Sequence, residues 1–467
     1  MPRDMTSAMH TPTNHSRRDF LSGLGCLGGG LLLNTLPSFS AQAQSFGDYK
    51  ALVCVFLLGG NDGNNLIVPN DTTGYGKYAA IRGDYTAGSG GIGLPRSQLL
   101  VLQPAAGNAA FGAHPALTEL QQVWNAGDLA VLFNVGTLAR PLTKAGYGNR
   151  TLTPDNLFSH ADQQSQWQSA VSQGSSRTGW GGRLADAVRS ANGAAPVPPL
   201  VAWGRNDLFA IGNATMSLSV PSSGSFGLTN FGGSYRSSLN SSMNQLLQSD
   251  RSNVLAMSAQ DTVSAALTSS SALSPILTGT SSSINGLFSG QSSGIAQQLL
   301  QTARMIEARS TLGVSRQIFY VTLGGFDTHN SQVETQEELF GQLSPALKAF
   351  QDSMAQLGMA DQVTTFTVSD FGRTLKPASG GGTDHAWGNH HLVMGGAVRG
   401  QRFYGQFPEH ALGGPDDVTS EGRWLPTTSV DQYGATLSRW FGVSDADLAT
   451  VFPNLQQFPT KDLGFLG

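Results

Sequence analysis

The 467-residue chain is short of cysteine, of charge and of long apolar runs. Its two cysteines are Cys26 and Cys54, and Cys54 lies inside an apolar run, where we expect a buried thiol rather than a zinc ligand. Charged residues make up 12% of the chain, about half of the usual share. The net charge of −4 excludes the basic balance of nucleic-acid-binding proteins.

The N-terminal segment is typical of an export signal. Paired arginines in "SRRDFLS" are followed by a glycine-rich apolar stretch and then by "AQAQ", Ala41 to Gln44. This order resembles a twin-arginine signal and predicts cleavage after Ala43. The apolar stretch is shorter than the ~20 residues of a membrane span, which disfavours a stable membrane anchor. We therefore expect residues 1–43 to be a signal read by the twin-arginine translocase, and residues 44–467 to be one periplasmic or secreted domain.

Short apolar runs alternate with helical patterns along the rest of the chain. Continuous apolar runs bounded by turn residues are typical of buried parallel strands, and the alternation predicts helices on both faces of the sheet. We expect an α/β fold, a three-layer α/β/α sandwich around a mostly parallel sheet. The expected strands are 52–58, 129–135, 199–203, 317–325, 363–369 and 391–398, and the clearest helices are 116–127, 294–313 and 334–358.

Two stretches interrupt the alternation. Residues 216–293 are rich in Ser, Gly, Asn and Gln, and we interpret them as an insertion over the top of the sheet, either a lid or an interaction surface. Residues 69–105 are rich in glycine and poor in strand patterns, which predicts a loop.

Acidic residues follow several of the expected strands. Ligands bind beyond the carboxyl ends of parallel strands, so these acids are candidates for a metal site. Carboxylates suit Mg²⁺ or Ca²⁺, and carboxylates with imidazoles suit Zn²⁺ or Mn²⁺. The alternatives are turn chemistry around the first acid and helix N-caps elsewhere. The acids are Asp62, Asp327, Asp370 and Asp384, with His329, His385, His390 and His391 in the same segments.

Several segments together resemble an exported bacterial family called domain of unknown function 1501. They include "LVCVFLLGGNDGNNLIVP", "FSHADQQSQWQ", "GGFDTHNSQ", "SDFGRT" and "GTDHAWGNHHLVMGGAVRG". The family is grouped with the alkaline phosphatase-like fold, which phosphatases, sulfatases and cofactor-independent phosphoglycerate mutase share. The resemblance therefore implies an alkaline phosphatase-like domain with one or two divalent cations at the strand ends.

The order of functional residues in that superfamily maps onto this chain. The mapping implies Asp62 as the first acid, Ser159 as the nucleophile, Asp327 with His329, then Asp370 and His385. A Zn²⁺ or Mn²⁺ ion is favoured at Asp327, His329 and His385, and a Mg²⁺ or Ca²⁺ ion is the alternative at Asp62 and Asp370. Asn64 and Asn65 are further oxygen donors beside the first acid, and Asp384, His390 and His391 form a second tier of candidates.

The resemblance implies hydrolysis of phosphate or sulfate esters. In this hypothesis Ser159 attacks the ester, His160 orients substrate or protonates the leaving group, and Arg373 grips two ester oxygens. A surface ion pair on a helix is the alternative role for Arg373. A different class of function also stays open, in which the chain is an exported scaffold or partner-binding protein with a vestigial or structural metal site.

Overall fold

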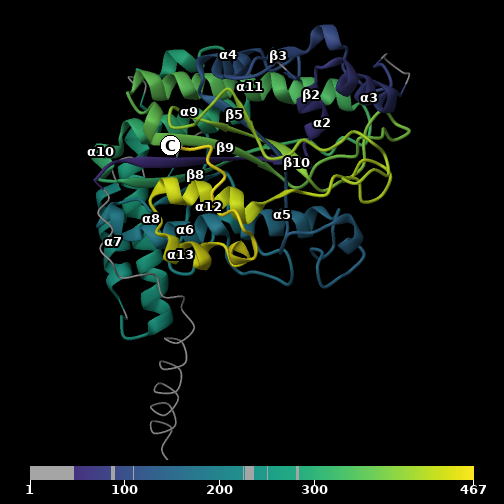
Figure 1. Cartoon of the computed structure of the whole chain (residues 1–467). Coiled ribbons are helices and arrows are strands. Elements are labelled where there is room, and N and C mark those ends of the chain that lie inside the picture. The colour runs from purple at the N-terminus through teal and green to yellow at the C-terminus, as the bar shows by residue number, and fades with distance from the viewer. Residues whose placement is uncertain are drawn as a thin grey trace, which may run out of the picture. The chain divides into compact units, whose positions relative to one another are not determined.

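The computed structural model describes residues 47–85, 90–108, 110–223, 226, 236–249, 251–279 and 283–467. The expected export signal, residues 1–43, lies outside these ranges. No helix within them is both long and apolar enough to span a membrane. Strands β5, β8, β9 and β10 of the central sheet and the helices around it are labelled in Figure 1.

The central sheet is mostly parallel, as expected. Its order is β11-β5-β10-β9-β1-β8-β6-β7, and β12 pairs with β5. Only β10 runs antiparallel to its neighbours β5 and β9. The strands are β1 (Lys50–Leu58), β5 (Leu129–Gly136), β6 (Leu200–Trp203), β7 (Leu218–Val220), β8 (Arg316–Gly324), β9 (Val363–Ser369), β10 (Asn389–Met394), β11 (Arg402–Tyr404) and β12 (Thr428–Ser429).

Helices cover both faces of this sheet, which confirms the three-layer α/β/α prediction (Figure 1). Because side chains alternate along a strand, Val53 and Val55 of β1 pack in one core cluster and Leu52 and Cys54 pack in the other. Cys54 is a free, buried thiol, as predicted. The first face carries α4 (Thr118–Ala126), α9 (Gly294–Glu307) and α11 (Gln332–Gln356), with α10 (Arg309–Leu312) after α9; the second carries α5 (His160–Ser169), α6 (Trp180–Val188), α12 (Val430–Phe441) and α13 (Asp445–Val451).

The prediction of a loop over residues 69–105 is wrong in part. This region contains helix α3 (Thr72–Arg82) and strand β3 (Leu100–Leu102), and β3 joins a small antiparallel sheet in the order β2-β4-β3. Helix α3 forms because the Asp71 side chain accepts hydrogen bonds from the first turn and because Tyr78 and Arg82 are buried. The neighbouring elements are α2 (Gly63–Leu66), β2 (Ile67–Pro69) and β4 (Phe111–Ala113).

The described residues of the serine-rich insertion do not lie over the carboxyl ends of the strands. Its first strand, β7, extends the sheet beside β6. Its two helices, α7 (Arg236–Gln248) and α8 (Val254–Leu277), lie at the lower left of Figure 1, whereas α2, α3 and α5 lie at the right. The expected position over the top of the sheet is therefore corrected for the part of the insertion that the structure describes.

Candidate metal centre

The carboxyl ends of three adjacent parallel strands bring the candidate residues together. Strand β1 lies between β8 and β9, so the segments that follow all three meet at one edge of the sheet. The backbone N–H of Gly59, directly after β1, donates to the Asp370 carboxylate at 3.1 Å. Gly59 has a φ of +113°, and a Cβ there would lie 2.5 Å from the Asp327 nitrogen. Glycine is thus required for this close approach of the strand ends.

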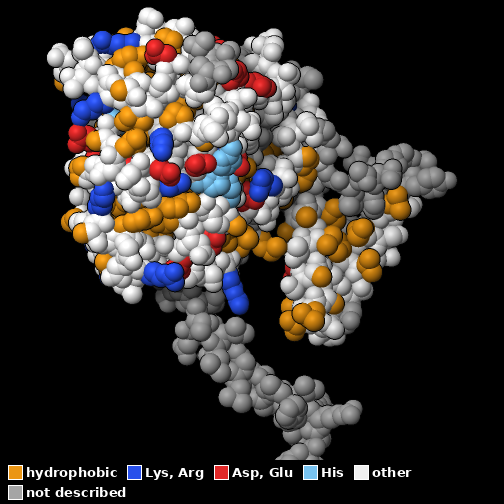
Figure 2. Space-filling model, turned by 90° about the vertical axis from the view of Figure 1, so that its right-hand side faces the viewer, with side chains coloured by type: hydrophobic (Ala, Val, Ile, Leu, Met, Phe, Trp, Pro, Cys, Tyr) orange, Lys and Arg blue, Asp and Glu red, His pale blue; other side chains and the backbone are white. Residues whose placement is uncertain are grey.

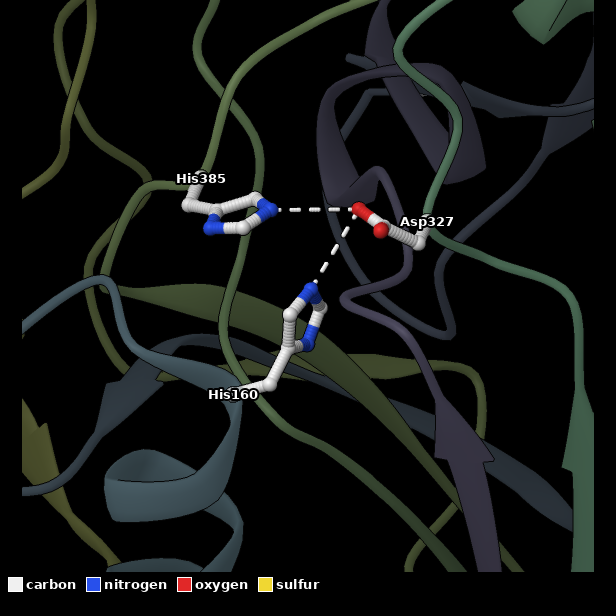
Figure 3. Close-up of side chains that lie close together, drawn as sticks. All are labelled: His160, Asp327 and His385. Carbon is white, nitrogen blue, oxygen red and sulfur yellow. Dashed lines mark hydrogen bonds and ion pairs between the residues drawn. The ribbon is translucent and has the colours of Figure 1, made fainter.

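Three imidazoles converge on one carboxylate oxygen at this edge. Figure 3 shows His160 and His385 pointing at Asp327 from opposite segments. The His385 Nε2 atom lies 3.1 Å from Asp327 Oδ1, and the His160 Nε2 atom lies 3.4 Å from it. The His329 Nε2 atom lies 3.0 Å from the same oxygen and 3.0 Å from His385 Nε2.

The second ring nitrogen of each histidine faces an acceptor. His385 Nδ1 lies 2.8 Å from the Phe158 carbonyl oxygen, and His160 Nδ1 lies 2.7 Å from Asp370 Oδ2. His329 Nδ1 lies 3.4 Å from a carboxylate oxygen of Asp384. Because a carbonyl oxygen only accepts, His385 Nδ1 carries the proton, which leaves a lone pair on Nε2 in the neutral ring. Metal-binding histidines are held by outer hydrogen bonds of this kind.

The inner carboxylate oxygen of the cluster, Asp327 Oδ1, also contacts the guanidinium of Arg373. His160 Nε2 is buried and has no hydrogen-bond partner. The Nε2 atoms of His329 and His385 face each other across 3.0 Å, beside a carboxylate. A divalent cation could be held by His160, Asp327 and His385, whose ligand atoms all lie within 4.8 Å of one another. Imidazoles with one carboxylate are a donor set that suits Zn²⁺ or Mn²⁺.

Electrostatics keep the central carboxylate ionised. Burial alone would raise the pKa of Asp327, but hydrogen bonds and charge from Arg373, together with His385, lower it to about 2. Burial lowers the pKa of His385, which favours the neutral ring that a metal ligand needs. The hydrogen bond with Asp370 raises the pKa of His160, against the effect of burial. Without a divalent cation, a proton on His160 would add positive charge to that of Arg373.

The guanidinium of Arg373 is committed to the protein itself. It is fully buried and donates to the carbonyl oxygens of Gly60 at 2.8 Å, Thr383 at 2.6 Å and Gly59 at 2.9 Å, and to the Asp327 carboxylate. This placement corrects both sequence-based roles, since Arg373 lies neither on a helix surface nor free to grip an ester. Its role is to tie the strand ends together and to orient Asp327.

The structure gives Asp62 a protein cation in place of a metal. Asp62 is fully buried and forms a two-pronged ion pair with Arg82 of α3. Gln332 also donates to its carboxylate at 2.6 Å. Asn64 donates to Asp62, and Asn65 accepts from Arg82. The expected oxygen-rich cation site at Asp62 and Asp370 therefore has no support here. Arg82 already neutralises the charge of Asp62, and the Asp370 carboxylate forms a hydrogen bond with His160.

Ser159 precedes the histidine that joins the cluster. It occupies the N-cap position of α5, and its hydroxyl donates to Asp162 at 2.6 Å. The sequence-based reading placed the nucleophile here and gave His160 a supporting role. The structure instead brings His160 to the cluster around Asp327. The sequence signal for this placement was the "SH" pair at the helix start. Phe158, whose carbonyl oxygen faces His385, has a φ of +72°, which is strained for a bulky residue.

The second-tier histidines lie inside the protein core. His390 and His391 belong to β10, and burial lowers the pKa of both to about 3. The His391 ring packs against Trp167 and Tyr433, at centroid distances of 4.8 and 6.0 Å. The structure does not bring these two rings to the cluster. Asp384 is half-exposed and faces His329, so it is an outer partner of the site.

The sequence matches the model of a family described as a protein of unknown function, DUF1501, over residues 49–445. The chain belongs to this family. Among proteins with curated descriptions, none matches the sequence of this DUF1501 member.

Solved structures show weak likenesses to this DUF1501 protein. One is the protein Ps i-CgsB in complex with a neocarrahexaose (TM-score 0.36, 9% identity, 89% of this chain and 75% of that one). Another is the lipoteichoic acid synthase LtaP from Listeria monocytogenes (0.35, 8%, 88% and 77%). A third is an alkaline phosphatase superfamily protein from Vibrio parahaemolyticus (0.33, 12%, 88% and 72%). At these scores the likenesses carry no argument about activity.

Proposed function

We propose that this DUF1501 protein binds one divalent cation, Zn²⁺ or Mn²⁺, and hydrolyses phosphate or sulfate esters at that site. The ligands would be the Asp327 carboxylate and the Nε2 atoms of His160, His329 and His385. The observation that carries the proposal is the convergence of these three nitrogens on one ionised carboxylate, with each outer nitrogen held by an acceptor.

When bound, a divalent cation supplies Lewis acidity towards an ester oxygen and towards water. The protein's own residues support that chemistry by fixing the geometry. Arg373 holds Asp327, and Asp370 holds the His160 ring while Gln164 donates to Asp370 at 2.7 Å. Because these side chains are already held in place, little reorganisation of the site would be needed during a reaction.

The site is open to solvent. The side chains of His329 and Asp327 are 43% and 46% exposed, and pale-blue histidines are visible on the face shown in Figure 2. The cluster is therefore accessible to an ester from solvent.

Metal analysis tests the binding half of the proposal. Purified protein is loaded with Zn²⁺ or Mn²⁺, dialysed and examined by elemental analysis. We expect close to one ion per chain, and much less in Asp327→Ala and His385→Ala. The matched control is Asn330→Ala, next to the site and exposed, which should keep its metal. Equal metal content in all variants would remove these residues from the site.

Turnover tests the catalytic half. The loaded protein is assayed with nitrophenyl phosphate and nitrophenyl sulfate, and we expect hydrolysis that is lost in Asp327→Ala. In Ser159→Ala, complete loss of turnover with retained metal would support a covalent nucleophile. Retained turnover would favour attack by water, in keeping with the bond from Ser159 to Asp162.

A non-catalytic scaffold with a structural cation is the second candidate. It is favoured by Arg373, whose hydrogen bonds to carbonyl oxygens leave no guanidinium edge for an ester. A protein that holds metal but hydrolyses neither ester would support the scaffold and refute the hydrolase.

We further propose that the protein is exported in folded form by the twin-arginine translocase and acts in the periplasm or outside the cell. The support is the "SRRDFL" segment followed by "AQAQ". Sequencing the N-terminus of exported protein should give Gln44. A chain that begins at Met1, or that carries a lipid on Cys26, would contradict this.

A further inference from the structure

His385 is held at both its ring and its backbone by residues from two other segments. Its Nδ1 atom lies 2.8 Å from the carbonyl oxygen of Phe158. Its own carbonyl oxygen accepts a hydrogen bond from Nε of Arg423 at 2.7 Å. The guanidinium carbon of Arg423 lies 4.9 Å from the centroid of the Phe158 ring, a cation–π contact. Each of the three residues therefore contacts the other two.

The backbone at Phe158 has a conformation that the surrounding structure must impose. Its φ is +72°, and Asn156, two residues earlier, has a φ of +47°. Strained conformations of this kind persist only where neighbouring groups fix them. The Phe158 N–H donates to the Gln163 side chain at 2.5 Å, and the Asn156 side chain donates to Asp162 at 3.0 Å. These contacts hold the turn that aims the Phe158 carbonyl oxygen at His385.

Arg423 is fixed from its own side as well. Its backbone N–H donates to the fully buried carboxylate of Asp417 at 3.1 Å. Asp417 also accepts from three other backbone N–H groups of the same loop, those of Gly413, Thr419 and Gly422. The Nη1 atom of Arg423 pairs with Glu421 at 2.5 Å. Because Glu421 balances the charge of the guanidinium, the effect of Arg423 on His385 is geometric.

We propose that Phe158 and Arg423 are positioning residues of the metal centre. They hold His385 with its proton on Nδ1 and with its Nε2 lone pair directed at the cluster around Asp327 (Figure 3). An outer acceptor fixes both the tautomer and the orientation of a metal-binding imidazole. The consequence for metal binding rests on the proposed function, whereas the tautomer of His385 does not depend on a bound ion.

Chelator competition on the zinc-loaded full chain tests the consequence for metal binding. We expect the dissociation constant for zinc to rise about 10–100-fold in Arg423→Met and in Phe158→Leu. Arg423→Lys keeps the charge but lacks the Nε donor, so it should weaken binding as Arg423→Met does. Phe158→Tyr keeps an aromatic ring and should restore wild-type affinity. The matched control is Arg189→Met, at an exposed arginine outside the site, which should bind zinc like the wild type.

The double variant Arg423→Met/Phe158→Leu separates a shared role from two independent ones. Because both residues act through His385, its loss of zinc affinity should be smaller than the product of the two single losses. A loss equal to that product would overturn the proposal. Wild-type zinc affinity in Arg423→Met, with only the KM for nitrophenyl phosphate raised, would overturn it in favour of a contact with substrate. Wild-type affinity in Arg423→Lys would also overturn it, since charge alone would then suffice.

Nuclear magnetic resonance of the metal-free protein tests the tautomer directly. The ring nitrogens of histidine are labelled with ¹⁵N, and the His385 signals are assigned by their loss in His385→Gln. Burial lowers the pKa of His385, so its ring is neutral at about pH 8. We expect the Nδ1–H tautomer in the wild type and in Phe158→Tyr, and a mixture of tautomers in Phe158→Leu.

This measurement keeps the inference separate from the proposed function, because it needs neither bound zinc nor turnover. The Nε2–H tautomer in the wild type would overturn the positioning role even if the protein binds zinc. The Nδ1–H tautomer in a protein that binds no zinc would refute the proposed function and leave the positioning of His385 supported. Far-UV circular dichroism should be the same for the wild type and all variants.

Discussion

Replacing Arg82 by methionine should destabilise the protein strongly without altering its metal content. Both side chains of the pair with Asp62 are fully buried. In addition to its two contacts with Asp62, Arg82 donates to the Asn65 side chain at 2.8 Å and to the Thr374 carbonyl at 3.0 Å. Methionine fills similar space but donates no hydrogen bond. It leaves a buried carboxylate with only the Gln332 and Asn64 donors.

The size of the effect follows from the burial of that charge. Removal of one partner from a buried ion pair costs about 3–5 kcal/mol, because the remaining charge stays out of water. We expect the free energy of unfolding, measured by urea denaturation, to fall by about this amount. Added Mg²⁺ or Ca²⁺ should not restore it. The double variant Asp62→Asn/Arg82→Met should be more stable than Arg82→Met, since it removes the orphaned charge.

Two results would refute this reasoning. A loss in Arg82→Met below about 1 kcal/mol would mean that the pair is worth no more than a surface ion pair. Recovery of stability with Mg²⁺ or Ca²⁺ in Arg82→Met, absent in the double variant, would show that Asp62 takes a cation once Arg82 is gone. The oxygen-rich site implied by the resemblance would then be real.

Three further predictions concern buried ionisable groups. Burial raises the pKa of Asp431 to about 8, although the Asn454 backbone donates a hydrogen bond to its carboxylate. The stability that the protonated Asp431 contributes is therefore lost as the pH rises from about 4 to 8. Over that pH window, the melting temperature of Asp431→Asn should rise relative to that of the wild type. Burial lowers the pKa of His391 to about 3. The stability that depends on its neutral ring is present near neutral pH and is lost as the pH falls below 6.5. His391→Phe keeps a ring against Trp167 and should therefore unfold at a lower pH than the wild type, with unchanged metal content. Asp370→Asn should weaken zinc affinity by about 10–100-fold in a chelator competition assay, because the imidazole it orients loses its carboxylate; unaltered affinity would exclude this outer contact from the site.

The strands could be predicted from sequence because their signal is local. The run "VTTFTVS" predicts a strand over 363–369, and β9 has these bounds. The run 52–58 lies within β1. Buried parallel strands need apolar side chains on both faces, so each strand carries its own signature. Helix α3 was missed because its short polar sequence has only Asp71 as a start signal and depends on burying Tyr78.

The types of ligand at the strand ends were also predictable, since Asp327 and His329 follow one strand and His385 precedes another. Which acids share a cation was decided only by the tertiary structure. The order of the strands places Asp327 beside the segment that carries His160, far away in the chain, and α3 brings Arg82 to Asp62. Charge neutralisation depends on which side chains meet in space rather than on neighbours in sequence, so the sequence by itself determined the candidates, and the packing of distant segments selected among them.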